Sequence, residues 1–461
     1  MNNLFTYNIS QQNTLYKGIP MKLTVFGFFL ITAIFASPSL IANESSGLTE
    51  IYEQAIQSDP QIAAAKFGLE AGKEKSVQGL SLLLPQAQFS AGINYTKSST
   101  DTPKSDNSSD SRNLALQLTQ PLFNASNGAS YDQSKIATKQ SEIEYKLAEQ
   151  DLILRVSQAY FDVLSAQENL AVAEAQTRAL DESLARANLT FKVGTATKTD
   201  KLEAQARFDL ARASQLSAEN QLAIAKQILT SITGASSNKL KSLNKNAKLS
   251  SLQPTTMDEW VELAVTNSYQ LKLGQFGVDI SQHEVRKLKN DRLPTIDFVA
   301  SASNSKQFLS FVGSDSTTTS LSAGVQLSVP LYTGGLMSSR IKEAEHQRAQ
   351  QKELQTNTQR QIVLQTQQAF LSATNSFQQI EALKQALLSS ESALQATQKG
   401  LEVGVRTNLD VLNAQQQFYS TERDYRIAKF NYLLLVLNLK ATAGMLSATD
   451  IQALDALLTG A

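Results

Sequence analysis

The stretch Gln86-Ala-Gln-Phe-Ser-Ala-Gly-Ile-Asn-Tyr-Thr96 alternates between polar and apolar side chains. A period of two places the two sets on opposite faces of a β-strand. Three further stretches, at 112–121, 295–304 and 319–330, repeat the pattern, so we expect four strands, the first over about 86–97. Each is about ten residues long, the length of a tilted strand that crosses a membrane with an apolar outer and a polar inner face.

Alternation alone also fits a soluble β-sandwich, and two features favour the membrane. Residues 97–111 and 305–319 are rich in Ser, Thr and Asp and predict long surface loops, and the inward residues are too small to form a separate core. Open strand edges are not tolerated in lipid, and a barrel needs at least about eight strands. We therefore expect subunits to pool their strands, and the polar inner faces favour a ring larger than a dimer provides.

The strands belong to a tandem repeat. Landmarks recur at an offset of about 210 residues: Leu84-Pro85 with Leu293-Pro294, Gln120-Pro-Leu-Phe123 with Val329-Pro-Leu-Tyr332, and Gly234 with Gly444. The predicted copies cover 43–234 and 258–444. A Ser/Asn/Lys-rich linker at 235–257 joins them, and 445–461 forms a C-terminal tail.

Each copy continues into two long helices, predicted at 124–193 and 197–233, and again at 335–403 and 407–443. A run of about 65 residues without a helix breaker is on the order of 100 Å long. The first long helix carries a seven-residue seam of Leu152, Ala159, Ala166, Ala173, Leu180 and Ala187. Such a seam predicts coiled-coil packing. A coiled-coil envelope tether is the alternative interpretation, but it does not need four strands of membrane type.

The N-terminal residues 1–42 predict an extension and a signal peptide, with Met1 or Met21 as the start. Met21-Lys22 precedes an apolar run from Leu23 to Ala36, which is typical of a secretory signal. We expect cleavage after Ala42, with Ser37 and Ser39 marking an alternative site. A membrane anchor is less favoured because the run is shorter than the ~20 residues that a spanning helix needs.

The composition argues against an enzyme. The chain has 42 basic and 42 acidic residues, no Cys and two His. Thiol nucleophiles, thiolate metal sites and a lipid-modified Cys are therefore excluded, and balanced charge gives no indication of a nucleic-acid partner. We expect no catalytic residues, no metal site and no cofactor.

The motifs together resemble the TolC family of outer-membrane efflux proteins. The resemblance rests on Gln120-Pro-Leu-Phe123, Val329-Pro-Leu-Tyr-Thr-Gly-Gly335 and Leu401-Glu-Val-Gly-Val-Arg-Thr-Asn-Leu-Asp-Val-Leu-Asn413, and it covers about 48–444. It implies an α+β membrane protein: a homotrimer whose twelve-stranded outer-membrane β-barrel, with four strands per chain, continues into a periplasmic α-helical barrel. It also implies an exit duct for small toxic compounds or unfolded proteins. The implied partners are a periplasmic adaptor (membrane fusion) protein and an inner-membrane ABC or proton-driven transporter.

The resemblance also implies a gate at the helix tips, formed by Thr199, Asp200, Arg406 and Asp410. Arg406 would bond Thr199 or Asp200 on a neighbouring helix and hold the tips shut, and Asp410 would project into the narrowed lumen. A ring of like charges at a constriction selects cations. The adaptor would dock on the turns, at Val193, Gly194, Thr195, Val403, Gly404 and Val405.

Capping offers a simpler role for the two aspartates. Thr197 to Asp200 and Thr407 to Asp410 both fit a capping box, and the residues leave open whether capping acts alone or together with gating. Arg406 has no such role. Two positions depart from the family pattern: Leu401 stands where a Tyr is usual, and Asn413 stands where a second Asp is usual. One carboxylate ring instead of two is therefore expected.

Overall fold

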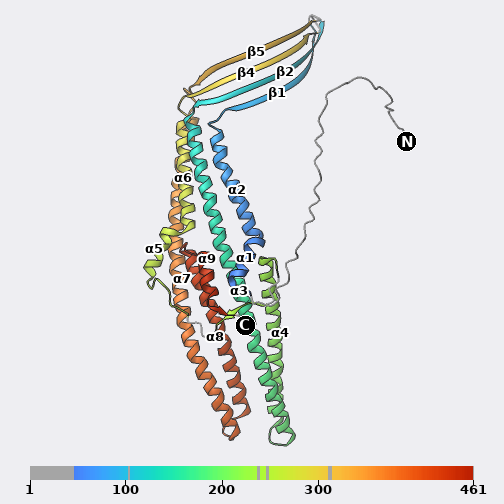
Figure 1. Ribbon diagram of the computed structural model, residues 1–461, viewed down its shortest axis with the longest axis vertical. Coiled ribbons are helices and arrows are strands. Elements are labelled where there is room, and N and C mark those ends of the chain that lie inside the picture. The colour runs from blue at the N-terminus through green and yellow to red at the C-terminus, as the bar shows by residue number, and fades with distance from the viewer. Residues whose placement is uncertain (1–45, 102–103, 236–238, 245–248, 310–313, 460–461) are drawn as a thin grey trace, which may run out of the picture. The chain divides into compact units, whose positions relative to one another are not determined.

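The computed structural model describes residues 46–101, 104–235, 239–244, 249–309 and 314–459. Its four long strands form one antiparallel sheet in the order β1-β2-β4-β5, with β1 at Gln86–Asp101, β2 at Lys104–Phe123, β4 at Thr295–Leu309 and β5 at Ser314–Ser328. The central pair, β2 and β4, comes from opposite halves of the chain. Within the chain β1 and β5 are therefore the two outer strands of the sheet (Figure 1).

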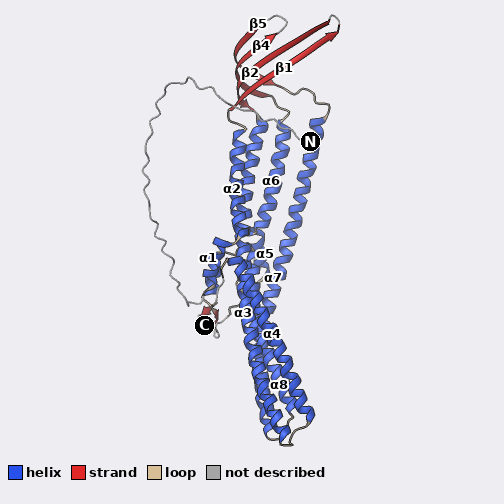
Figure 2. Ribbon diagram, turned by 90° about the vertical axis from the view of Figure 1, so that its right-hand side faces the viewer, coloured by secondary structure: helices blue, strands red, loops and turns tan. Residues whose placement is uncertain are grey.

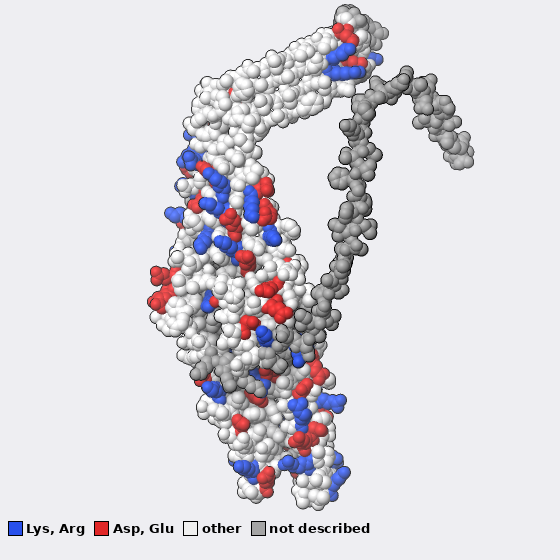
Figure 3. Space-filling model, viewed as in Figure 1, with Lys and Arg blue, Asp and Glu red and all other residues white. Residues whose placement is uncertain are grey.

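The register sorts side chains into rows on the two faces of the sheet. Phe89 lies opposite Leu116, Leu116 opposite Ala302, and Ala302 opposite Leu321, which gives an apolar row across all four strands. On the other face the row is Gln88, Gln117, Ser301 and Ser322. Phe89 is 67% and Leu321 86% exposed, so one face of the sheet presents apolar side chains that no described residue covers. Charged side chains gather at the end of the strands far from the helices (Figure 3).

The strands are longer than the alternation predicted. Residues 97–111 and 305–319 were expected to be loops, but β1 extends to Asp101, β2 begins at Lys104, β4 extends to Leu309 and β5 begins at Ser314. This prediction was wrong because the backbone ladder continues after the apolar alternation stops. Ser and Thr fit a strand whose two faces are both polar, and there the sequence shows no contrast.

Short and long helices follow the same order in both halves. In the first, α1 (Leu48–Ser58) and α2 (Pro60–Ser81) precede the strands, and α3 (Ala125–Lys192) and α4 (Lys198–Thr233) follow them. In the second, α5 (Met257–Asn267) and α6 (Tyr269–Asn290) precede, and α7 (Leu336–Glu402) and α8 (Asn408–Thr442) follow. α3 packs along α4, and α7 along α8, so each half ends in a long helical hairpin (Figures 1 and 2). No described helix is both long and apolar enough to span a bilayer.

The two halves form one compact unit from Glu44 to Ala461, and the largest core lies where α1, α3, α4, α8 and α9 (Ala448–Asp455) meet. Tyr160 and Phe161 are fully buried there, and Phe161 stacks near Phe430. The Tyr160 hydroxyl donates to the carbonyl oxygen of Lys241 at 2.7 Å. The seam residues Leu152, Ala159, Leu180 and Ala187 are buried as well.

The segments expected to be a linker and a tail are part of this central region. β3 (Ser242–Leu243) pairs antiparallel with β6 (Leu458–Thr459), and Ser46 bridges to Leu240. The described residues of the linker predicted at 235–257 therefore also pack against the rest of this region. Their polarity suggested a linker, but Leu240 and Leu252 are buried and bring the backbone into the core. The predicted signal peptide at 1–42 lies outside the described residues.

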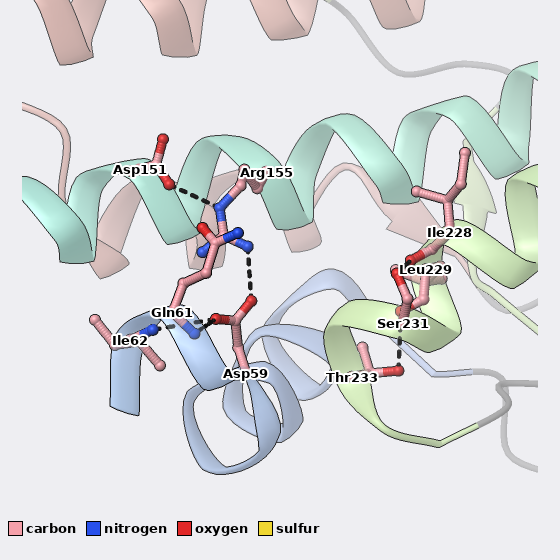
Figure 4. Close-up of polar contacts among 9 residues, drawn as sticks. All are labelled: Asp59, Gln61, Ile62, Asp151, Arg155, Ile228, Leu229, Ser231 and Thr233. Carbon is pink, nitrogen blue, oxygen red and sulfur yellow. Dashed lines mark hydrogen bonds and ion pairs between the residues drawn. The ribbon is translucent and has the colours of Figure 1, made fainter. Parts of the chain in front are cut away.

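A buried carboxylate fixes the junction of α1 and α2 against α3 (Figure 4). Asp59 caps α2 by accepting from the amides of Gln61 and Ile62 at 2.6 and 3.1 Å, and it accepts from the Arg155 guanidinium at 2.6 Å. Burial alone would raise the pKa of Asp59, but the hydrogen bonds from Arg155 and from the two amides outweigh burial, so the pKa is lowered. The carboxylate therefore stays ionised and ties the short helices to the long one.

Candidate functional site: the two hairpin tips

Both hairpin turns end their first helix in the same way. Gly194 and Gly404 follow the last turns of α3 and α7 with φ of 80° and 79°. The amide of Gly194 donates to Phe191 and that of Thr195 to Thr190, at 3.1 and 2.9 Å. In the second tip Gly404 donates to Leu401 and Val405 to Gly400, also at 3.1 and 2.9 Å. This pair of bonds is a Schellman motif, and its left-handed residue favours glycine.

Both tips also begin their second helix in the same way. The Thr197 hydroxyl accepts from the Asp200 amide at 3.1 Å, and the Asp200 carboxylate accepts from the Thr197 amide at 2.9 Å. Thr407 and Asp410 form the same box at 3.2 and 2.8 Å. The amide and hydroxyl of each Thr lower the pKa of its Asp. The carboxylates are therefore ionised at neutral pH, and capping accounts for their placement whether or not they also gate.

The tips differ in what lies over the last turn of the first helix. Arg406 packs its stem across Gly400: a Cβ on Gly400 would lie 2.7 Å from Arg406 Cγ and 3.3 Å from Arg406 Cβ. The Arg406 amide also donates to the Gly400 carbonyl oxygen at 3.1 Å. In the first tip Thr190 and Ala196 occupy the matching positions. In the second tip, Gly400 has no side chain and therefore leaves room for the long side chain of Arg406.

The predicted bond from Arg406 to Thr199 or Asp200 is not formed within one chain. Among the described residues no hydrogen bond or ion pair joins Arg406 to either of them, and its charge instead contributes to lowering the pKa of Asp410. Arg406 and Thr199 are exposed, so both remain open to a neighbouring chain.

The residues expected to dock an adaptor lie at the ends of the turns. Val193 is 66% exposed, and Val403 and Val405 are each 74% exposed. Thr195, Gly194 and Gly404 are exposed as well. Leu401 is half-buried one turn above. Each tip therefore presents apolar side chains that nothing in the described chain covers, on a turn held rigid by its own hydrogen bonds.

Asn413 takes part in a contact that sequence reasoning missed. Arg207 of α4 donates from Nη2 to Asn413 Oδ1 at 3.0 Å and from Nη1 to Gln416 Oε1 at 2.6 Å, both on α8. Beside this contact Leu412, Leu180 and Ala211 form a small buried cluster with Phe208 packed against it. No local pattern points to Arg207, because its partners lie about two hundred residues away. The packing of Arg406 over Gly400 was likewise not predicted from the sequence and comes from the structure.

In the part of the chain that the structure describes, no group of three or more acidic or histidine side chains is placed to hold a metal ion. The tips carry half-buried carboxylates at Asp200 and Asp410, an exposed arginine at Arg406 and apolar turns. This set of side chains suits a charged aperture and a docking surface.

A family profile described as outer membrane efflux protein matches the chain twice, at residues 51–235 and 260–445. Outer membrane protein TolC of Vibrio cholerae is 31% identical over 89% of this chain and 94% of its own length. Proteases secretion protein PrtF of Dickeya chrysanthemi is 31% identical over 90% of this chain and 91% of its own. Among solved structures, the outer membrane protein VceC of Vibrio cholerae superimposes with a TM-score of 0.70 at 19% identity, covering 86% of this chain and 96% of that one.

Proposed function

This chain belongs to the outer membrane efflux protein family, and from that membership we propose that three copies of it form one continuous duct. The resemblance stated from the motifs is confirmed by the match over both halves of the chain. The protein is an outer-membrane exit duct for drugs or secreted proteins, not an enzyme.

The trimer is proposed because the four-stranded sheet of one chain has two unpaired edges. β1 and β5 are its outer strands, and one of its faces is an exposed apolar surface. Lipid does not tolerate open edges. Pairing β5 of one copy with β1 of the next would remove every edge, and three copies would supply twelve strands around a polar interior.

The long hairpins would continue the duct through the periplasm. α3 and α7 have 68 and 67 residues, so each is about 100 Å long. We propose that an inner-membrane transporter, of the ABC or proton-driven type, delivers cargo through a periplasmic adaptor. The adaptor would dock on the two turns that carry exposed valines, at Val193 and at Val403 to Val405. PrtF is named for protease secretion, and a neighbouring gene for an ABC exporter would favour protein cargo here.

The tips would be the gate. Asp410 would face the narrowed lumen, and Arg406 would reach Thr199 or Asp200 of a neighbouring chain. Three observations support this proposal. Arg406 is exposed, the absence of a side chain at Gly400 leaves room for the aliphatic part of Arg406, and both aspartates are ionised.

Planar-bilayer recording of the trimer purified in detergent tests the proposal. A duct gives discrete conductance steps, which cations applied to the tip side reduce. A coiled-coil tether, the competing function, would insert without conducting, and that result would refute the duct. Cross-linking that yields only monomers or dimers would refute the trimer.

A further inference from the structure

Arg207 joins the two hairpins of one chain close to their tips. Its guanidinium donates to Asn413 and Gln416, which lie three residues apart and so share one face of α8. We infer that Arg207 is a positioning residue, a latch that holds α4 against α8 and so sets how far apart the two tips lie. The inference rests on the proposed gate and identifies a contact that keeps it narrow.

Each hairpin is a rigid unit at its tip. The Schellman bonds and the capping box close each turn with contacts from its own hairpin only. The position of one tip relative to the other must therefore come from contacts between the hairpins. Another polar link joins Arg426 of α8 to Glu168 of α3. Arg426 is 13 residues after Asn413 on α8, which places this link about 20 Å farther from the turns.

The contact of Arg207 with α8 lies close to both tips, so its loss should change the distance between the tips directly. Arg207 is ten residues after Thr197, about 15 Å along α4, and Asn413 is six residues after Thr407, about 9 Å along α8. The neighbouring cluster of Leu180, Ala211 and Leu412 limits water on one side of the contact. The Arg207 side chain is 29% exposed, and Glu203 lies 3.8 Å away on its own helix, so the guanidinium keeps a counter-charge when its partners on α8 leave.

The chemistry of position 413 suits a contact that must release. A carboxylate there would form an ion pair with Arg207, and its two oxygens could accept from the guanidinium in a bidentate arrangement. Asn413 offers one neutral acceptor, and Gln416 offers a second on the next turn. The departure at Asn413 therefore does more than remove a lumen charge: it converts the site into a latch with two neutral acceptors.

Arg207→Ala in the full trimer tests the latch by two measurements. In planar bilayers it should raise the open-to-closed ratio roughly fivefold to tenfold, as expected for lost hydrogen bonds to a charged donor. Because the chain has no Cys, Lys198→Cys with Asn408→Cys gives clean spin-label sites at the two helix starts. With labelled chains diluted by unlabelled ones, the Arg207→Ala variant should give a longer and broader distance distribution between the labels.

Arg212→Ala is the matched control, since Arg212 is an exposed arginine on the same helix. It should change neither measurement. The exchange Arg207→Asn with Asn413→Arg should restore both measurements at least in part, which a merely destabilised helix would not do.

The outcomes separate the latch from the gate. A changed label distance with unchanged conductance supports the latch and refutes the proposed gate. An unchanged distance refutes the latch, and the gate then stands or falls on Arg406→Ser alone. An equal effect of Arg212→Ala also refutes the latch.

Discussion

The two hairpin tips share a backbone and differ in side chains. Both use a left-handed glycine and a Thr-Asp capping box, with hydrogen-bond lengths that agree within 0.1 Å. Over that common frame the first tip carries Thr190 and Ala196, and the second carries Gly400 and Arg406. The turn geometry depends on a few local residues, so the other positions were free to diverge. Five tests could break or sharpen this contrast.

Removal of the arginine should have the largest effect. Arg406→Ser in the trimer should raise the open-to-closed ratio more than about tenfold, because bonds to an ionised group are among the strongest that a tip can lose. Ala196→Ser at the matching position of the first tip should leave planar-bilayer conductance unchanged. Equal conductance in wild type and Arg406→Ser would sink the assignment of Arg406 to the gate.

A side chain added at Gly400 should affect the gate by displacing Arg406. Gly400→Ala places a methyl group within 2.7 Å of Arg406 Cγ, and overpacking of about 1 kcal/mol would shift the gate roughly fivefold. In the Arg406→Ser background the same change should have no further effect on conductance. Gly68→Ala is the control, since a Cβ there meets nothing within 4 Å. An effect that persists without Arg406 would contradict a positioning role.

Neutralising one aspartate should separate capping from gating. Asp410→Asn keeps a cap acceptor but removes the charge, and it should weaken divalent-cation block about threefold, since exposed charges interact weakly in water. Asp200→Asn should leave the block unchanged if only the second tip lines the aperture. Blocking constants measured for both variants decide this point, and equal weakening would show that both tips line it.

The same block should depend on pH in a defined direction. The amide and hydroxyl of Thr407 lower the pKa of Asp410, and Arg406 adds to this. A lowered pKa keeps the carboxylate ionised at pH values below the usual titration range of an aspartate, so block should persist on acidification and be lost only below that range. Loss of block near pH 6 would assign it to another group.

The smallest effect should be the same in both tips. Thr197→Ala and Thr407→Ala each remove a helix cap and should cost about 1 kcal/mol of local stability. Amide hydrogen exchange in the first turns of α4 and α8 measures this directly. Clearly unequal losses of local stability in the two variants would show that the two capping boxes are not equivalent.

Sequence patterns predicted those features that depend on residues close together in the sequence. Gly194, Gly404 and the two Thr-Asp boxes mark helix ends because each bond joins residues within about five positions. The alternation found the strands only where one face is apolar, and it missed the ends of the hairpins around Asp101 and Lys104, where both faces are polar. A shared offset of about 210 residues was enough to pair the halves.

Contacts between distant residues came only from the tertiary structure. The pairing of β2 with β4, the joining of Leu243 to Leu458, and the link from Arg207 to Asn413 each bring together residues more than one hundred and seventy positions apart. No local propensity encodes such pairs, because their free energy arises only once the whole chain has packed. The sequence by itself determined two hairpins with rigid turns and four half-apolar strands. The tertiary structure decided how the hairpins are held against each other, and it left two strand edges for other copies of the chain to complete.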